Sequence, residues 1–308
     1  MTPELMEGRS AAPEGGAPPV GRLVDVSGRR LFVHTKGSGG PVVVILPGAG
    51  AIGLDYLNVF ERIAEHSATV LYDRGGTGWS DAADLPRSAP EVVDELRALL
   101  EALGAAPPYL LVGHSLGGAF ARHFAQRFPA EVAGLLLLDP AHEELDAHYP
   151  QEVRELFAQF VDAPIPDFPP EMLELWRGVF ADKLQRWPEG VRGPLIVRHV
   201  ERWRAGFLEG QKTEALVYEP LRRAGGLPDV PLIVLSAMGI DASPTASLPE
   251  GMQRGVNGAK QAVNRLLAGS VPRGEERELD GATHVWMHIE REDSVVAALV
   301  DLIGRICA

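Results

Sequence analysis

Tyr109-Leu110-Leu111-Val112-Gly113-His114-Ser115-Leu116-Gly117-Gly118 is the stretch that decides the fold of this chain. It begins with one aromatic and three apolar residues, as a short buried strand does, and apolar residues recur at helical spacing from Ala119 onward. Gly113 and Gly117 let backbone segments pass where a Cβ would clash, so a strand can turn directly into a helix. Ser115 is then expected in a strained turn, with its hydroxyl above the sheet edge. The pattern predicts a nucleophilic serine, and the alternative is a glycine-rich turn with an incidental serine.

Length and composition limit the class of protein. The 308 residues suffice for one large α/β domain, or for a core with an insertion. Hydrophobic residues make up 45% and charged residues 23%, as in a soluble globular protein. The 29 basic and 42 acidic residues give a net charge of −13, which repels nucleic-acid phosphates and anionic lipid. Neither nucleic acid nor a membrane is therefore an expected partner.

The cysteine content and the first residues bear on redox chemistry and targeting. The single cysteine, Cys307, excludes an intrachain disulfide and argues against a cysteine-ligated metal. Residues 1–19 are rich in Ala, Pro, Gly and Glu and lack both the basic cluster and the apolar segment of a secretion signal. We expect them to form a disordered tail. With no apolar run of membrane-spanning length, the sequence predicts a cytoplasmic protein and leaves its oligomeric state open.

Strands and helices alternate along most of the chain. Several apolar runs have no polar face, which is typical of strands in the centre of a parallel sheet. Short links between alternating elements predict an α/β fold, with a mostly parallel central sheet and helices on both faces. The expected strands are a hairpin of 20–26 and 30–35, then 42–46, 69–72, 109–112, 135–138, 231–236 and 276–279, and the expected helices are 55–65, 88–103, 119–128, 252–267 and 295–303.

The alternation stops after Pro140. Residues 141–226 contain no strand of the buried kind, and several prolines divide them into short helical pieces. We expect a helical cap over the sheet edge, so that 20–140 and 227–308 form the core and 141–226 the cap. The aromatic residues of this stretch are expected mostly to form its own small core, with one or two facing a pocket for an apolar acyl or ring group: Trp176, Phe180, Trp187, Trp203 and Phe207.

A serine hydroxyl is inert at neutral pH unless a base takes its proton. Of nine histidines, His284 is the best candidate, because it lies in a loop between the last expected strand and the last helix. The order of the sheet brings that loop back over Ser115. The alternative for His284 is a structural surface histidine, and His288, one helical turn further on, is expected to pack or to form a hydrogen bond.

The base needs a carboxylate to fix its tautomer, and two aspartates qualify. Asp139 ends the strand after the serine turn and its helix, while Asp241 follows the next strand, and either could instead be a turn former. A developing oxyanion also needs donors. Leu116 N–H is expected to supply one. Ala49 N–H, in a loop of small residues after the strand 42–46, is expected to supply the other, although that loop could simply be a tight turn.

With these parts in order, the chain resembles the α/β-hydrolase fold family from about residue 20 onward. The order of nucleophile, acid and base in the chain agrees with that family for either aspartate. The motifs that carry the resemblance are Leu46-Pro47-Gly48-Ala49-Gly50, Tyr72-Asp73-Arg74-Gly75-Gly76-Thr77-Gly78-Trp79-Ser80-Asp81, the stretch 113–118, Leu138-Asp139, and 281–284.

Two departures from the family pattern bear on the site. The oxyanion loop begins Pro47-Gly48 where the family commonly has His-Gly, which removes a supporting side chain and leaves the backbone donor. Asp241 is followed by Ala-Ser-Pro-Thr-Ala-Ser, which weakens its match to the usual loop, and a similar bacterial branch carries its acid in Leu-Asp-Pro-Ala-His. The resemblance therefore places Asp139 ahead of Asp241. It also implies that Asp73-Arg74 is structural and braces the turn near the site.

No cofactor or metal is expected. His142, Glu143 and His148 lie close together but lack the spacing of the H-E-x-x-H motif. The glycines at 75, 76 and 78 form no dinucleotide fingerprint.

The sequence predicts a serine hydrolase that cleaves an ester, thioester or lactone of a small molecule. Ser115 attacks, His284 relays the proton, Asp139 or Asp241 orients His284, and the Ala49 and Leu116 amides hold the oxyanion. The alternatives are a C–C lyase, cyclase or acyltransferase on the same scaffold, or a non-catalytic binding protein. Epoxide hydrolases and haloalkane dehalogenases of this fold place Asp at the apex, where this chain has Ser115.

Overall fold

The computed structural model describes residues 16–161, 163–165, 167–242 and 248–307, so most of the expected tail lies outside the described residues. Eight strands form one sheet in the order β1-β2-β4-β3-β5-β6-β7-β8. β2 pairs antiparallel with β1 and β4, and all other neighbours pair in parallel, which confirms the predicted sheet. The strands are β1 Arg22–Val26, β2 Arg29–Lys36, β3 Val42–Leu46, β4 Thr69–Tyr72, β5 Tyr109–His114, β6 Val132–Leu138, β7 Leu232–Ala237 and β8 Gly274–Leu279.

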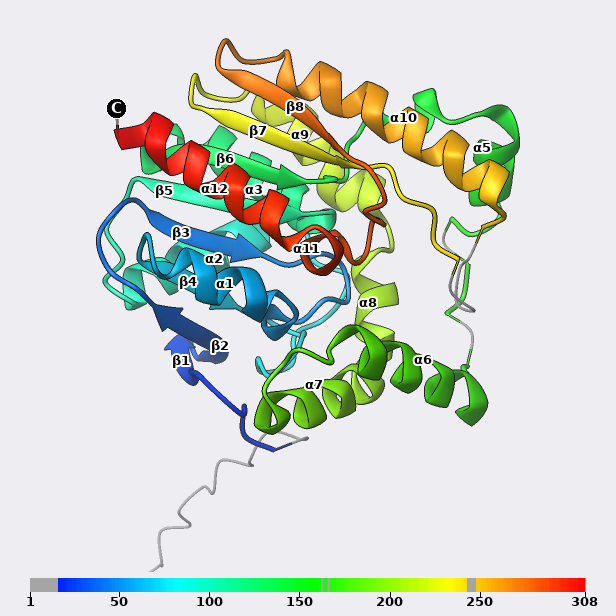
Figure 1. Ribbon diagram of the computed structural model, residues 1–308, viewed down its shortest axis with the longest axis horizontal. Coiled ribbons are helices and arrows are strands. Elements are labelled where there is room, and N and C mark those ends of the chain that lie inside the picture. The colour runs from blue at the N-terminus through cyan, green and yellow to red at the C-terminus, as the bar shows by residue number, and fades with distance from the viewer. Residues whose placement is uncertain (1–15, 162, 166, 243–247, 308) are drawn as a thin grey trace, which may run out of the picture.

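Helices cover both faces of the sheet (Figure 1). Successive residues of a strand point to opposite faces, so Leu110 and Leu111 of β5 belong to different apolar clusters. The cluster with Leu110 includes residues of α1 and α12, and the cluster with Leu111 includes residues of α2, α3 and α10. These helices are α1 Leu57–Ile63, α2 Ala89–Ala102, α3 Leu116–Arg127, α10 Glu250–Ala268 and α12 Glu292–Cys307, with the short η1 Gly53–Tyr56, η2 Pro129–Glu131 and α11 Met287–Glu290 between them.

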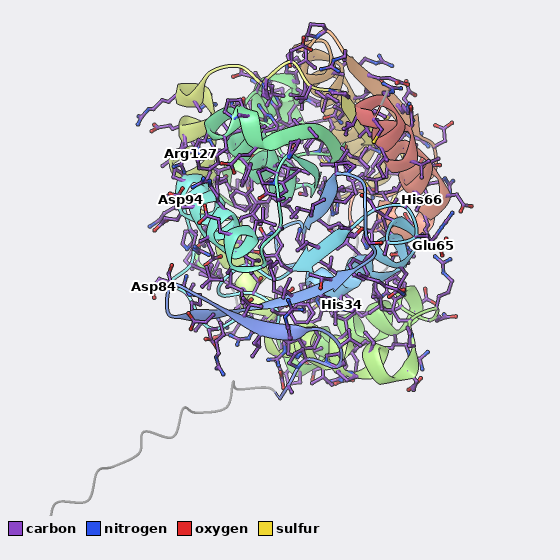
Figure 2. The ribbon with its side chains drawn as sticks, turned by 90° about the vertical axis from the view of Figure 1, so that its left-hand side faces the viewer. His34, Glu65, His66, Asp84, Asp94 and Arg127 are labelled. Carbon is purple, nitrogen blue, oxygen red and sulfur yellow. The ribbon has the colours of Figure 1, made fainter. Side chains whose placement is uncertain are left out.

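Figure 2 shows the two helical layers and the sheet between them from another side. Asp94 of α2 and Arg127 of α3 lie together on one flank, and their side chains form an ion pair of 2.8 Å. Glu65 and His66, which follow α1, lie on the other flank, with His34 of β2 between the two layers.

The helices between β6 and β7 fall into three groups. α4 and α5 contact α10, whereas η3 and α9 pack against α3 and add Val217 and Leu221 to the apolar cluster beneath it. α6, α7 and α8 lie together beyond the carboxyl ends of the strands (Figure 1), and we call them the roof helices. The bounds are α4 Leu145–His148, α5 Gln151–Ala158, α6 Pro170–Lys183, α7 Glu189–Glu201, α8 Trp203–Glu209, η3 Glu214–Tyr218 and α9 Glu219–Ala224.

The roof helices are fastened to the loop that follows β3. Trp187, between α6 and α7, is buried, and its Nε1–H donates to the Leu54 carbonyl at 2.7 Å. Leu195 of α7 joins the same apolar cluster as Ile52 and Leu54. Across the described ranges of the chain, no helix has both the length and the apolar character that a membrane crossing requires.

Candidate active site

Ser115 occupies the sharp turn between β5 and α3. Its backbone has φ 50° and ψ −120°, a conformation that costs a non-glycine residue about 1–3 kcal/mol. A Cβ on Gly113 would lie 2.6 Å from the Gly117 carbonyl oxygen, and a Cβ on Gly117 would clash with the Leu46 carbonyl oxygen. Both glycines are therefore required for the turn that places the serine at the end of the sheet.

Three side chains from distant segments form one chain of hydrogen bonds. His284 Nε2 lies 3.0 Å from Ser115 Oγ, and His284 Nδ1 lies 2.6 Å from Asp139 Oδ2. Asp139 directly follows β6 and its side chain is fully buried, whereas about a third of the His284 side chain is exposed. The structure thus brings together the predicted nucleophile, the predicted base and the first of the two candidate acids.

Asp241 lies in the same region with a different environment. It lines the cavity above Ser115, and its backbone N–H donates to Gln253 Oε1 at 2.7 Å. Both aspartates follow neighbouring parallel strands, as the sequence indicated. The carboxylate that accepts the His284 Nδ1 hydrogen bond is that of Asp139.

The Asp139 carboxylate has a second cationic partner that sequence reasoning missed. Lys260 Nζ, from α10, lies 2.7 Å from Asp139 Oδ2. Burial by itself would raise the pKa of the Asp139 carboxyl, but Lys260 and the hydrogen bond from His284 outweigh it and hold the pKa well below its usual range. One signal for Lys260 was available: with Asn257 and Asn264 it places polar side chains on the otherwise apolar face of the expected helix.

Behind His284, the hydrogen-bonded pair of His114 and Tyr56 holds the His284 backbone. His114 Nε2 lies 2.7 Å from the His284 carbonyl oxygen, and His114 Nδ1 lies 2.6 Å from Tyr56 Oη, which accepts from Gly48 N–H at 3.3 Å. Since a carbonyl only accepts, Nε2 carries the proton and the Tyr56 hydroxyl donates to Nδ1. Burial lowers the pKa of His114 well below its ordinary value, in agreement with a neutral ring.

The loop after β3 is braced by a buried ion pair. Arg74 donates to the carbonyl oxygens of Pro47 (2.6 Å) and Gly48 (2.8 Å), and its guanidinium forms two further hydrogen bonds with Glu209 of α8. Glu209 Oε2 in turn accepts from Gly50 N–H at 2.9 Å. Arg74 therefore braces the turn, as the family resemblance implied, whereas its partner on the roof helices was not predicted.

Two backbone amides remain available near Ser115. Ala49 lines the cavity together with Ser115, and Leu116 is the first residue of α3. Within the ranges that the structure describes, neither amide donates to a protein acceptor. Both are thus free to receive a ligand oxygen.

The cavity above Ser115 has a volume of about 420 Å³. The expectation that only one or two aromatic residues of the insertion face a pocket is wrong, because Trp176, Phe180, Trp203 and Phe207 all line it. Helical spacing indicated that the aromatic residues of each helix share one face of that helix. It did not indicate that this face lies opposite the edge of the sheet. Trp187 alone of the five predicted aromatic residues is absent from the lining.

A second histidine–carboxylate pair lies in the wall of the cavity. His199 Nε2, from α7, lies 2.7 Å from Asp55 Oδ1 of η1, and both side chains are buried. The His199 ring stacks on Phe180, with 4.0 Å between ring centroids. This contact ties the roof helices to the core, and no sequence signal indicated it.

Two other residues that the sequence singled out, His288 and Glu143, have structural partners. His288 stacks on Tyr56 at 4.3 Å between centroids, as expected of a packing residue. Glu143 forms a two-pronged ion pair with the buried Arg122, at 2.7 and 2.8 Å. Among the residues with described positions, no three or more His, Cys, Asp or Glu side chains group as metal ligands would.

Comparison with known proteins identifies the fold family. Residues 41–210, more than half of the chain, match the family model of the alpha/beta hydrolase fold. The chain belongs to the alpha/beta hydrolase fold family. The match extends into the segment between β6 and β7, as far as the end of α8, where Glu209 accepts from Gly50 N–H in this alpha/beta hydrolase.

Curated relatives of this alpha/beta hydrolase match over part of its length. A pimeloyl-[acyl-carrier protein] methyl ester esterase from Xanthomonas oryzae is 37% identical over 123 residues, which are 39% of this chain and 46% of that protein. The uncharacterized protein YbdG from Bacillus subtilis is 30% identical over 121 residues, 39% of this chain and 37% of that protein. The chain thus spans less than half the length of these relatives.

Solved structures share the fold over nearly the whole chain. The enol-lactonase from Burkholderia xenovorans superposes with a TM-score of 0.60 at 19% identity, covering 92% of this chain and 100% of that one. A thermophilic esterase from Thermogutta terrifontis gives a TM-score of 0.58 at 18% identity, covering 92% and 98%. At this identity the likeness establishes the alpha/beta hydrolase fold.

Proposed function

We propose that the protein is a serine hydrolase that cleaves an ester-like acyl bond of a small molecule through an acyl-enzyme. The unbroken sequence of hydrogen bonds from Ser115 Oγ through His284 to Asp139 carries this proposal. It matches the arrangement by which a base activates a serine and a carboxylate orients the base.

The proposed reaction follows from the positions of these groups. His284 Nε2 takes the proton as Ser115 Oγ attacks the carbonyl carbon, while Asp139 accepts from Nδ1–H and stabilises the imidazolium. The Ala49 and Leu116 amides donate to the oxyanion. The imidazolium then protonates the leaving group, and water activated by His284 hydrolyses the acyl-enzyme to restore Ser115.

The cavity indicates the class of substrate. Aromatic side chains of α6 and α8 line it, so it suits an acyl or ring group without charge. One relative is named a methyl ester esterase and one solved structure an enol-lactonase, which favours a carboxylic ester or lactone. We propose that the roof helices are the part of the insertion that caps this cavity, with 141–226 as the inserted segment.

The test compares wild type and Ser115→Ala on a short-chain p-nitrophenyl ester and with a fluorophosphonate probe. Wild type is expected to turn over the ester and to be labelled by the probe. Ser115→Ala should lose labelling and lower kcat by about 10⁴-fold or more. Ser270→Ala, which removes a hydroxyl that donates to the Leu267 carbonyl at the end of α10, is the matched control and should keep wild-type activity.

Two results would oppose the proposal. Ester turnover by Ser115→Ala near the wild-type rate would remove the serine from the chemistry. Absence of labelling in wild type would leave an unactivated hydroxyl, as in a binding protein.

A further inference from the structure

The carboxylate of the proposed triad is shared between two nitrogen donors. Asp139 Oδ2 accepts hydrogen bonds from His284 Nδ1 at 2.6 Å and from Lys260 Nζ at 2.7 Å. The Asp139 side chain is fully buried and only 13% of the Lys260 side chain is exposed, so solvent screens this ion pair weakly. Among the described residues, the second carboxylate oxygen, Oδ1, has long contacts of 3.4 Å with Ala237 N–H and Asn264 Nδ2.

We propose that Lys260 is a positioning residue that keeps His284 neutral, and Ser115 therefore reactive, to a lower pH than Asp139 alone would allow. The inference rests on the hydrolase function proposed above. It assigns to α10 a role in the chemistry, through the carboxylate that α10 contacts.

The physical reason is the net charge beside the imidazole. A lone carboxylate favours the imidazolium form, whereas an ammonium on the same oxygen cancels most of that attraction. Burial is the largest cause that lowers the pKa of His284, and Lys260 lowers it further, while Asp139 opposes both. Removal of the ammonium leaves an uncompensated carboxylate, so the base should become easier to protonate.

The other charged or titratable groups near His284 do not duplicate this role. His114 of β5 faces the ring at 5.2 Å between centroids, and His288 of α11 packs against His114 in turn. Burial lowers the pKa of both His114 and His288. Glu290 of α11 accepts from Thr283 N–H and Oγ and pairs with Lys183 Nζ of α6 at 2.7 Å.

The cavity adds three more such groups. Asp55 of η1 pairs with His199 of α7 at 2.7 Å. Asp241 lines the same cavity after β7. Of the groups named here, Lys260 is the one whose cationic atom contacts the carboxylate bound to His284.

A purely structural role for Lys260 is already filled by its neighbours. Asn257 Nδ2 donates to the Gly239 carbonyl at 2.9 Å, and Asn264 Nδ2 donates to Ser236 Oγ at 3.0 Å. These two amides fasten α10 to β7 and to the loop that follows it. Lys260 lies between them along the helix and contacts the carboxylate instead.

The experiment measures pH dependence in Lys260→Met, Lys260→Arg and the control Lys36→Met, which removes the same charge from the exposed pair with Glu61. The readouts are kcat/KM for a p-nitrophenyl ester and the rate of fluorophosphonate labelling. In Lys260→Met the midpoint of the acid limb should rise by about one pH unit, a roughly tenfold loss of rate on that limb. Lys260→Arg and Lys36→Met should keep the wild-type midpoint.

The two proposals fail in different ways. An unchanged midpoint in Lys260→Met, with the rate lowered equally at every pH, would overturn the role of Lys260 and leave the hydrolase intact. If wild type neither hydrolyses nor labels, the hydrolase proposal fails, and an NMR titration of the His284 ring in both proteins still tests the inference. Should Lys260→Met not fold, Lys260→Gln supplies the same comparison.

Discussion

The Asp139 carboxylate contacts two other titratable side chains of the site, His284 and Lys260. Asp139 follows β6 in a positive-φ conformation (43°), and it contacts His284, Lys260 and, at longer range, the Ala237 amide of β7. Strand order left both Asp139 and Asp241 as candidates, because it fixes which loops meet but not which side chain reaches a given nitrogen, and only the family resemblance ranked Asp139 first. The observed contacts favour Asp139.

Substitution of each aspartate by asparagine should separate them. Asp139→Asn removes the charge that orients Nδ1–H and stabilises the imidazolium, so kcat should fall by about 10³–10⁴-fold. Asp241→Asn should stay within a few-fold of wild type. Steady-state kinetics on one ester suffices, and the reverse pattern would assign the acid to Asp241.

At the scale of elements, the loop after β3 and α8 form one unit. Glu209 binds both Arg74 and the Gly50 amide, and a Cβ on Gly206 would lie 2.8 Å from Gly50 Cα, so the two backbones are in direct contact. The geometry of the loop that carries the proposed oxyanion donor Ala49 therefore depends on a helix that lies outside the central sheet.

Glu209→Gln should reveal the importance of the buried pair. It leaves the Arg74 guanidinium buried without a counter-charge, and such a change costs about 3–5 kcal/mol. Urea unfolding measures this loss, and kcat for ester hydrolysis should fall with it. Glu250→Gln breaks the exposed pair with Arg254 and should cost less than about 1 kcal/mol; equal losses in the two variants would contradict the prediction.

Gly206→Ala tests the contact between backbones. The added methyl group must push α8 away from Gly50 in the loop after β3, so we expect a loss of about 1–3 kcal/mol in unfolding free energy and a lower kcat/KM. Gly193→Ala in α7 meets no atom within 4 Å and should stabilise the protein by about 0.5–1 kcal/mol. Thermal unfolding measures both changes. Melting temperatures that moved in the same direction in the two variants would contradict the prediction.

At the scale of the whole molecule, buried neutral histidines make stability depend on pH. Burial lowers the pKa of His288 to about 4, against an ordinary value near 6.5. Between these values the unfolded chain binds more protons than the folded one, so stability is present above pH 6.5 and is lost as pH falls toward 4.

The expected loss for His288 alone is about 2 kcal/mol between pH 7 and pH 5. Urea unfolding at both values measures it. His288→Leu, close in volume and without a titrating group, should lose less stability than wild type over the same interval. An equal loss in the variant would show that other groups cause the acid sensitivity.

The sheet, the serine turn and His284 were accessible from the sequence because apolar runs, glycine spacing and strand order are local or additive signals. The pairs that complete the site were not. Lys260 with Asp139, Arg74 with Glu209 and Asp55 with His199 join residues 121, 135 and 144 positions apart. No periodicity within a helix reports what lies opposite it, which is also why the sequence placed too few aromatic residues of the roof helices in the cavity wall.

The bond between Glu209 and Gly50 has a consequence for how such a protein diversifies. A foreign segment grafted in place of 141–226 would change the lining of the cavity and also delete Glu209, the acid that holds the loop after β3. New specificity in this scaffold therefore requires that any replacement segment bring its own acceptor for that amide and its own anion for Arg74.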